Sequence, residues 1–109
     1  MPENLKPLFQ AYLMASYGYY ILNASVISDE MYDNIAKLLL AHFDDFDHQH
    51  KYLISKDDLT AGTLYHLRGD DYPLMVQLAA ERWVFAPDVE KKERSEHIEL
   101  LLGVIAPAG

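Results

Sequence analysis

Phenol rings and carboxylates gather between residues 17 and 33, in the segment YGYYILNASVISDEMYD. Tyr19 and Tyr20 lie at the end of one predicted helix, Asp29 lies in the first turn of the next, and Tyr32 and Asp33 follow one turn later. The junction of two helices therefore collects phenols and carboxylates. Such a junction can hold a planar ligand. Alternatively, the tyrosines pack between the helices and the acids cap the second one.

The helices that position these side chains follow from apolar periodicity and capping residues. Spacings of three and four predict a first helix that begins near Pro7, or a few residues earlier, and ends near Asn23. Its apolar side comprises Leu5, Leu8, Phe9, Tyr12, Leu13, Ser16, Tyr19 and Tyr20. Ser28 is a good N-cap for a second helix over about residues 29–43. Its buried side is expected to comprise Met31, Ile35, Leu38, Leu39 and His42. Because the link is short, the two helices should form an antiparallel hairpin.

A short helix and a loop are predicted next. Ser55, followed three residues later by Asp58, resembles a capping box with a shorter acid. This pattern predicts a helix of one or two turns that ends at Gly62. Residues 63–72 are then expected to form a loop, with a brief extended piece at residues 64–67.

Two more helices are predicted near the end of the chain. The first should begin at Pro73 and stop at Ala86-Pro87. Its apolar side is expected to comprise Leu74, Met75, Leu78, Ala79, Arg82 and Trp83. Asp88 can cap the second helix, which should run from Val89 to about Leu102 with Gly103 as its end signal, before a loose tail at residues 106–109.

The predicted fold class is all-α, in a single domain over residues 1–109. A helical hairpin over residues 1–45 is expected to carry an extension over residues 46–109, in which two further helices and a short one pack on it. Half of the residues are apolar or aromatic, which is ample for one core.

Charge and composition narrow the range of possible functions and locations. The formal net charge is −8, so direct nucleic-acid binding is not expected, because an acidic surface repels phosphates. No segment has the length and apolarity of a membrane helix, and the N-terminus lacks a signal-peptide pattern. There are no cysteines, which excludes disulfides and thiolate metal sites. This composition fits a cytoplasmic location. If the protein is phage-encoded, the location would be the cytoplasm of the host cell.

The spacing of Tyr19-Tyr20 and Asp29-Glu30-Met31-Tyr32-Asp33 resembles the small N-terminal domain Ia of bacterial NAD-dependent DNA ligases. That domain carries a Tyr followed by His or Tyr, and about ten residues later an Asp-x-x-Tyr-Asp. It folds over the nicotinamide mononucleotide (NMN) half of NAD. The resemblance covers roughly residues 8–45 and implies that Tyr19 and Tyr32 contact the nicotinamide ring. It also implies that Tyr20, Asp29 and Asp33 bond ribose hydroxyls, the carboxamide or phosphate-bound groups.

The chain departs from the ligases in ways that exclude their reaction. The adenylating Lys-x-Asp-Gly motif is missing, because Lys56 is followed by Asp57-Asp58-Leu59, and no cysteine is present for the ligase zinc finger. The protein is therefore expected not to be an enzyme. The first half together with HQHKYLISKDDLTAGT also resembles short phage proteins that take their name from the ligase, which suggests a phage origin.

Other residue groups favour structural roles. His48, His50 and the aspartates around them could bind a divalent metal, but a solvated polar turn is the preferred interpretation. His42 is expected to be a core histidine, and Trp83 and Phe85 are expected in the core rather than on a binding surface. The acidic pairs are expected to be solvated. If they converged on one face they would suggest a mimic of DNA charge.

Two functions remain open. The first, preferred on sequence, is a non-catalytic acidic interaction protein that binds a host or DNA-metabolism protein and that could also form a homodimer. The second is a nicotinamide-nucleotide (NMN or NAD) binding module formed by Tyr19, Tyr20, Asp29, Tyr32 and Asp33. The exposure of the tyrosines, open to a concavity or sealed inside, separates the two.

Overall fold

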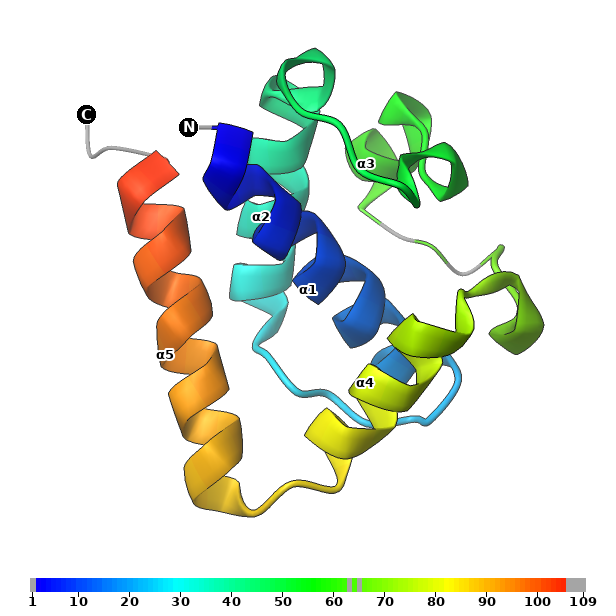
Figure 1. Cartoon of the computed structure of the whole chain (residues 1–109), viewed down its shortest axis with the longest axis vertical. Coiled ribbons are helices and arrows are strands. Elements are labelled where there is room, and N and C mark those ends of the chain that lie inside the picture. The colour runs from blue at the N-terminus through cyan, green and yellow to red at the C-terminus, as the bar shows by residue number, and fades with distance from the viewer. Residues whose placement is uncertain (1, 63, 65, 106–109) are drawn as a thin grey trace.

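The structure is a computed structural model that describes residues 2–62, 64 and 66–105, and every regular element in that part is helical (Figure 1). The α-helices are α1 (Pro2–Tyr20), α2 (Asp29–Ala41), α3 (Lys56–Ala61), α4 (Leu74–Val84) and α5 (Asp88–Ile105). Single 3-10 turns lie at Phe43–Asp45, Lys51–Leu53 and Gly69–Asp71. The predicted all-α class is confirmed, whereas the likeness to ligase domain Ia remains a prediction. The predicted loose tail lies outside the described residues.

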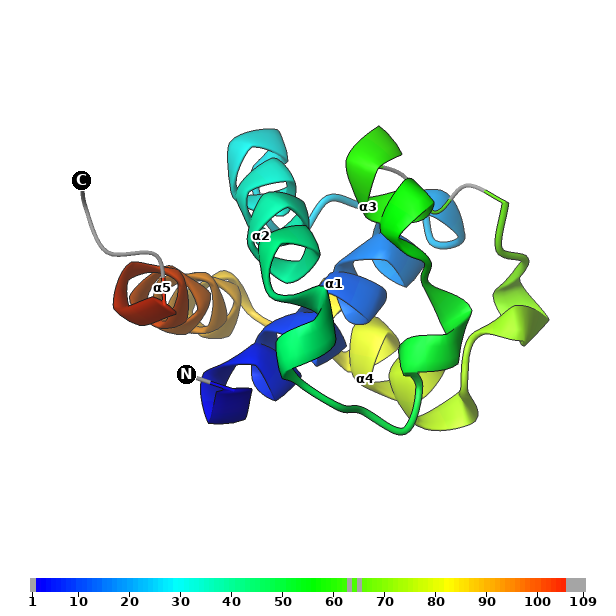
Figure 2. The same cartoon turned by 90° about the horizontal axis from the view of Figure 1, so that it is seen from above.

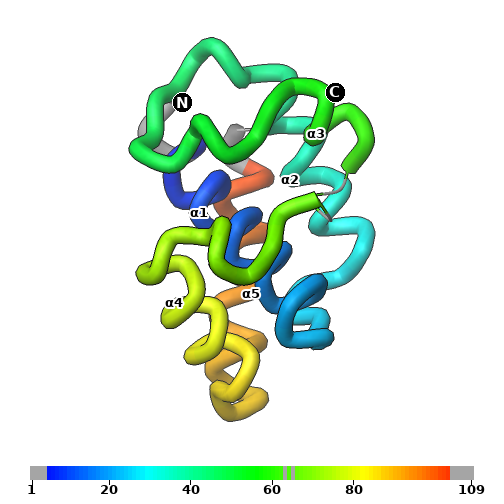
Figure 3. Tube along the Cα trace, turned by 90° about the vertical axis from the view of Figure 1, so that its right-hand side faces the viewer, coloured from blue at the N-terminus to red at the C-terminus, as the bar shows by residue number. Residues whose placement is uncertain are grey.

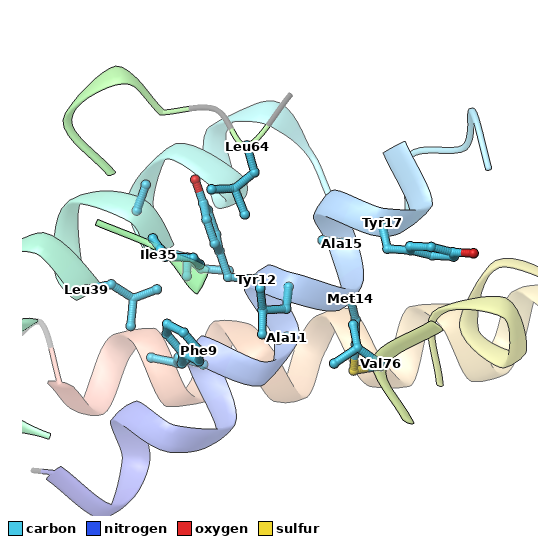
Figure 4. Packing of buried hydrophobic residues seen from close by; sticks show 14 of the residues in the cluster. Phe9, Ala11, Tyr12, Met14, Ala15, Tyr17, Ile35, Leu39, Leu64 and Val76 are labelled. Carbon is cyan, nitrogen blue, oxygen red and sulfur yellow. The ribbon is translucent and has the colours of Figure 1, made fainter. Parts of the chain in front are cut away.

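Helix α1 lies at the centre of the molecule and contacts α2, α4 and α5 (Figures 1 and 2). Residues 11–18 are all buried, so burial extends around the helix instead of following one side. Figure 4 shows Phe9 and Tyr12 on the side of α1 that faces α2, and Met14 on the side that faces α4. The helix begins at Pro2, five residues before Pro7, which therefore lies inside it.

The turn after α1 sets the direction of the hairpin. Asn23 has a left-handed backbone with a φ of 58°, which asparagine tolerates better than most residues. The Ala24 N–H donates to the Gly18 carbonyl at 2.9 Å. Gly18 also permits close packing of α4, because a Cβ there would lie 3.3 Å from Val84 Cγ2. From this turn α2 runs back in roughly the opposite direction to α1 (Figures 1 and 2).

Side-chain caps fix the starts of α2 and α3 as the sequence predicts. The Ser28 hydroxyl accepts a hydrogen bond from the Met31 N–H at 3.1 Å. At α3 the capping box is complete: the Asp58 N–H donates to Ser55 Oγ at 3.1 Å, and the Ser55 N–H donates to Asp58 Oδ2 at 2.9 Å. Gly62 ends α3 with a left-handed φ of 73°.

The predicted buried face of α4 is wrong. Leu74, Met75 and Leu78 are 66%, 73% and 53% exposed, whereas Val76 and Ala80 are buried. Phe85 was also expected in the core but is 77% exposed, while the prediction of a buried Trp83 is confirmed. Apolar residues surround most of α4, and its main contact with another helix is with α1. Figure 3 shows α4 on the outside of the molecule.

Several local predictions also need correction. Helix α5 continues through Gly103, where a Cβ would meet nothing within 4 Å, so this glycine is no end signal. The Leu67 N–H donates to the Leu64 carbonyl at 3.0 Å, a bond that the extended piece predicted at residues 64–67 would not make; Tyr65 of this piece lies outside the described residues. Helix α2 ends at Ala41, so His42 follows it as the C-cap. The His42 side chain is 37% exposed and pairs with Asp45 at 3.0 Å instead of entering the core.

Candidate functional site

A pocket of about 300 Å³ lies where the end of α1, the following loop and the first turns of α2 meet. All five residues predicted to form a site line this pocket: Tyr19, Tyr20, Asp29, Tyr32 and Asp33. The other lining residues are Ala15, Ser25, Val26, Ile27 and Gly62. We call it the hairpin pocket. Its volume is at the lower end of the range for small-molecule sites.

Tyr19 and Tyr20 come from the last turn of α1. Their rings meet edge to face, with centroids 4.9 Å apart and an interplanar angle of 86°. Tyr19 is 52% exposed and lies outside the core, whereas Tyr20 is half-buried and packs against the core that the earlier part of α1 forms. The expected place of Tyr19 on the buried side of the first helix is therefore wrong, whereas Tyr20 is on that side in part.

Tyr32 is held against α1 by stacking and by a hydrogen bond. Its ring lies on that of Tyr12, with centroids 4.4 Å apart and planes 19° from parallel. Its hydroxyl is 2.6 Å from Ser16 Oγ. Ser16 already donates its only hydroxyl proton to the Tyr12 carbonyl at 2.8 Å. The Tyr32 hydroxyl must therefore donate to Ser16, which leaves its oxygen able to accept a further hydrogen bond.

The electrostatics of the hairpin pocket favour cations and hydrogen-bond donors. Burial raises the pKa of Tyr32 above its ordinary value, so its phenol stays neutral at physiological pH. Asp29 and Asp33 are both exposed, and neither forms an ion pair with any residue whose side chain is described. Within the described part of the chain, the lining includes no lysine, arginine or histidine. The two carboxylates thus supply most of the charge of the pocket.

Three supporting residues were not singled out as part of the site. Gly62 joins the pocket from the end of α3, and a Cβ there would lie 3.9 Å from Asp33 Oδ1. Ser16 positions Tyr32, and its polar side chain on an otherwise apolar helix face was a signal that could have found it. Ser95 of α5 donates to the Val26 carbonyl at 3.3 Å and so ties α5 to the loop that lines the pocket.

The other candidate groups do not assemble a site. Among the described residues, no group of three or more His, Asp or Glu side chains is placed to hold a metal ion. Several aspartates have local partners: Asp44 pairs with Lys56 at 2.9 Å, Asp45 with His42, and Asp58 caps α3. No helix within the described part of the chain has the length and apolarity to cross a membrane.

Comparison with known proteins finds no matching family model, curated protein or solved structure. Any function of the hairpin pocket must therefore be inferred from its own residues and their geometry.

Proposed function

We propose that the hairpin pocket binds the nicotinamide riboside part of a nicotinamide nucleotide, without catalysing a reaction. One observation carries the proposal: Tyr19, Tyr20, Asp29, Tyr32 and Asp33, the residues in which the sequence resembles ligase domain Ia, line a single pocket that is open to solvent. The geometry favours this function over the interaction role that the sequence alone favoured.

The chemistry of the lining supports a cationic ring as the ligand. The pyridinium ring of oxidised nicotinamide carries a positive charge, and a tyrosine face attracts such a ring by about 0.5–1 kcal/mol at an exposed site. Tyr19 offers an exposed phenol for this contact. The carboxylates of Asp29 and Asp33 can accept hydrogen bonds from ribose hydroxyls, and charge-assisted bonds of this kind are stronger than neutral ones.

The same lining predicts how the ligand is oriented. A phosphate would find no basic side chain among the described lining residues, and the net charge of −8 opposes it further. The phosphate of NMN must therefore point out to solvent. Nicotinamide riboside, which lacks that phosphate, should bind at least as tightly as NMN.

An NMR titration with NMN and nicotinamide riboside tests the proposal. Saturable shifts of amides around residues 19–33 are expected, and Asp33→Asn or Tyr19→Ala should weaken binding at least fivefold. Two matched controls lie outside the pocket: Asp70→Asn, also an exposed aspartate, and Tyr52→Ala, at a tyrosine that is 78% exposed. An absence of shifts at millimolar ligand would remove the proposal.

A second candidate function, binding of a protein partner, is favoured by the exposed face of α4. Leu74, Met75 and Leu78 place three large apolar side chains on one helix surface, and contiguous patches of this kind mark interaction sites. The resemblance to a ligase fragment suggests a host DNA-metabolism protein as partner. Trp83 cannot contribute to this face, because it is 1% exposed.

Met75→Glu tests this second candidate. If α4 binds a partner or a second copy of the chain, the glutamate should abolish capture of that partner, or should convert a dimer to a monomer in sedimentation. Glu99→Gln on exposed α5 is the matched control. Unchanged capture and unchanged mass would refute a role for this face.

A further inference from the structure

A second concavity, separate from the hairpin pocket, lies between α1, α4 and α5. It has a volume of about 500 Å³ and shares no lining residue with the hairpin pocket. Its apolar walls include Ala11 and Met14 of α1, Trp83 of α4, and Ile98 and Leu101 of α5. We call it the α5 groove. Figure 1 shows α5 alongside α1, with α4 close to the start of α5.

Two residues that line this groove, Trp83 and Arg94, carry donor groups without an acceptor among the residues that the structure describes. The Trp83 side chain is 1% exposed, and its indole N–H is buried without a hydrogen-bond partner in that part of the chain. An unpaired buried donor is costly, which makes it a rare feature of folded proteins. Arg94 is half-buried and forms no ion pair with any described side chain.

The remaining charged groups of the groove lie at its exposed rim. Glu90, Glu93 and His97 are exposed residues of α5, whereas Arg94 on the same helix is half-buried. A carboxylate resting on the rim would meet two glutamates and be repelled. A carboxylate directed towards Arg94 would gain a planar guanidinium, which binds carboxylates through two parallel hydrogen bonds.

We propose that the α5 groove binds a small apolar carboxylic acid, whose carboxylate pairs with Arg94 and whose apolar body lies against Trp83, Met14 and Leu101. The volume and the mainly apolar lining, with a few polar groups, are those of a small-molecule site. The proposal is independent of the function of the hairpin pocket.

Trp83 makes the test direct, because it is the single tryptophan of the chain and lines the groove. The intact protein is titrated with decanoate, decanol and decyltrimethylammonium below their micelle concentrations, while the Trp83 emission is recorded. Decanoate should cause a saturable change and bind at least tenfold more tightly than decanol, since only decanoate can pair with Arg94. The Trp83 indole N–H resonance should shift with the same saturation curve.

Arg94→Gln should weaken decanoate binding at least tenfold and leave decanol unchanged, whereas Arg82→Gln, on the exposed side of α4, should change neither. Circular dichroism checks that both variants fold. If Arg94→Gln does not fold, the comparison of decanoate with decanol on the unmodified protein still decides. Equal affinities for the two, a preference for the ammonium compound, or no saturable signal would each overturn the proposal.

Discussion

Replacing Ser16 by alanine should have an effect on stability that depends on the residue at position 32. Ser16 is fully buried, donates to the Tyr12 carbonyl and accepts from the Tyr32 hydroxyl. In the Ser16→Ala variant the Tyr32 hydroxyl loses its acceptor, whereas the Tyr12 carbonyl loses only an additional donor. In a Tyr32→Phe background there is no hydroxyl at this position to leave unpaired. The same serine change should then have no cost.

The magnitudes follow from the 2.6 Å bond and from its half-buried surroundings. A hydrogen bond of this type contributes about 0.5–1.5 kcal/mol net, and alanine is better than serine inside a helix by up to about 0.5 kcal/mol. Ser16→Ala should therefore lower the free energy of unfolding by about 0.5–1 kcal/mol with Tyr32 present. In the Tyr32→Phe background it should be neutral or should raise the free energy of unfolding by about 0.5 kcal/mol.

A double-mutant cycle measured by urea denaturation tests this reasoning. The four proteins are the unmodified chain, the two single variants and the double variant. The coupling free energy should be about 1 kcal/mol, which is within the range for residues in contact. Additive effects would refute it, because they would mean that the Tyr32 hydroxyl does not depend on Ser16 and that the pocket wall is positioned by stacking alone.

Three further predictions concern the core, the pocket edge and pH. Tyr72→Phe should raise the midpoint of thermal unfolding, because the buried Tyr72 hydroxyl has no hydrogen-bond partner among the described residues. An unpaired buried hydroxyl costs about 1–3 kcal/mol. A lower midpoint would mean that the hydroxyl does have an acceptor. Gly62→Ala should lower the free energy of unfolding by about 1–2 kcal/mol because its φ is 73°, and Gly62→Asn should cost less. Burial lowers the pKa of His48 below its usual 6.5, so the unfolded chain takes up a proton first and stability should fall as pH drops through 6.5 towards the folded pKa. His48→Gln should reduce the loss of unfolding free energy between about pH 7.5 and 5.5, as measured by urea denaturation. An unchanged pH dependence would argue against a role for His48.

The features that the sequence predicts well are those decided by neighbouring residues. The caps at Ser28 and at Ser55 with Asp58 depend on a side chain three residues from its partner, and the end of α3 depends on the freedom of Gly62. Tyr19 to Asp33 lie within one hairpin, so their convergence on one pocket also follows from local structure. Gly62 reaches the same pocket from a distant segment, which local patterns cannot foresee.

The buried face of α4 could not be predicted, because its sequence offers two apolar faces. Leu74 and Leu78 suit one face, and Val76 and Ala80 suit the other. Packing against α1 decides between them, and Gly18 permits that packing by leaving room for Val84. The choice therefore depends on contacts between residues far apart in the sequence.

Comparison of oxidised with reduced NMN in an NMR titration tests the central claim most directly. The two ligands differ in the charge of the nicotinamide ring, which is the property that the phenols and carboxylates of the hairpin pocket are proposed to recognise. Oxidised NMN should shift the amides around Tyr19, Tyr32 and Asp33 saturably, and reduced NMN should bind several-fold more weakly. Equal binding of the two forms, or shifts confined to other parts of the chain, would contradict the claim.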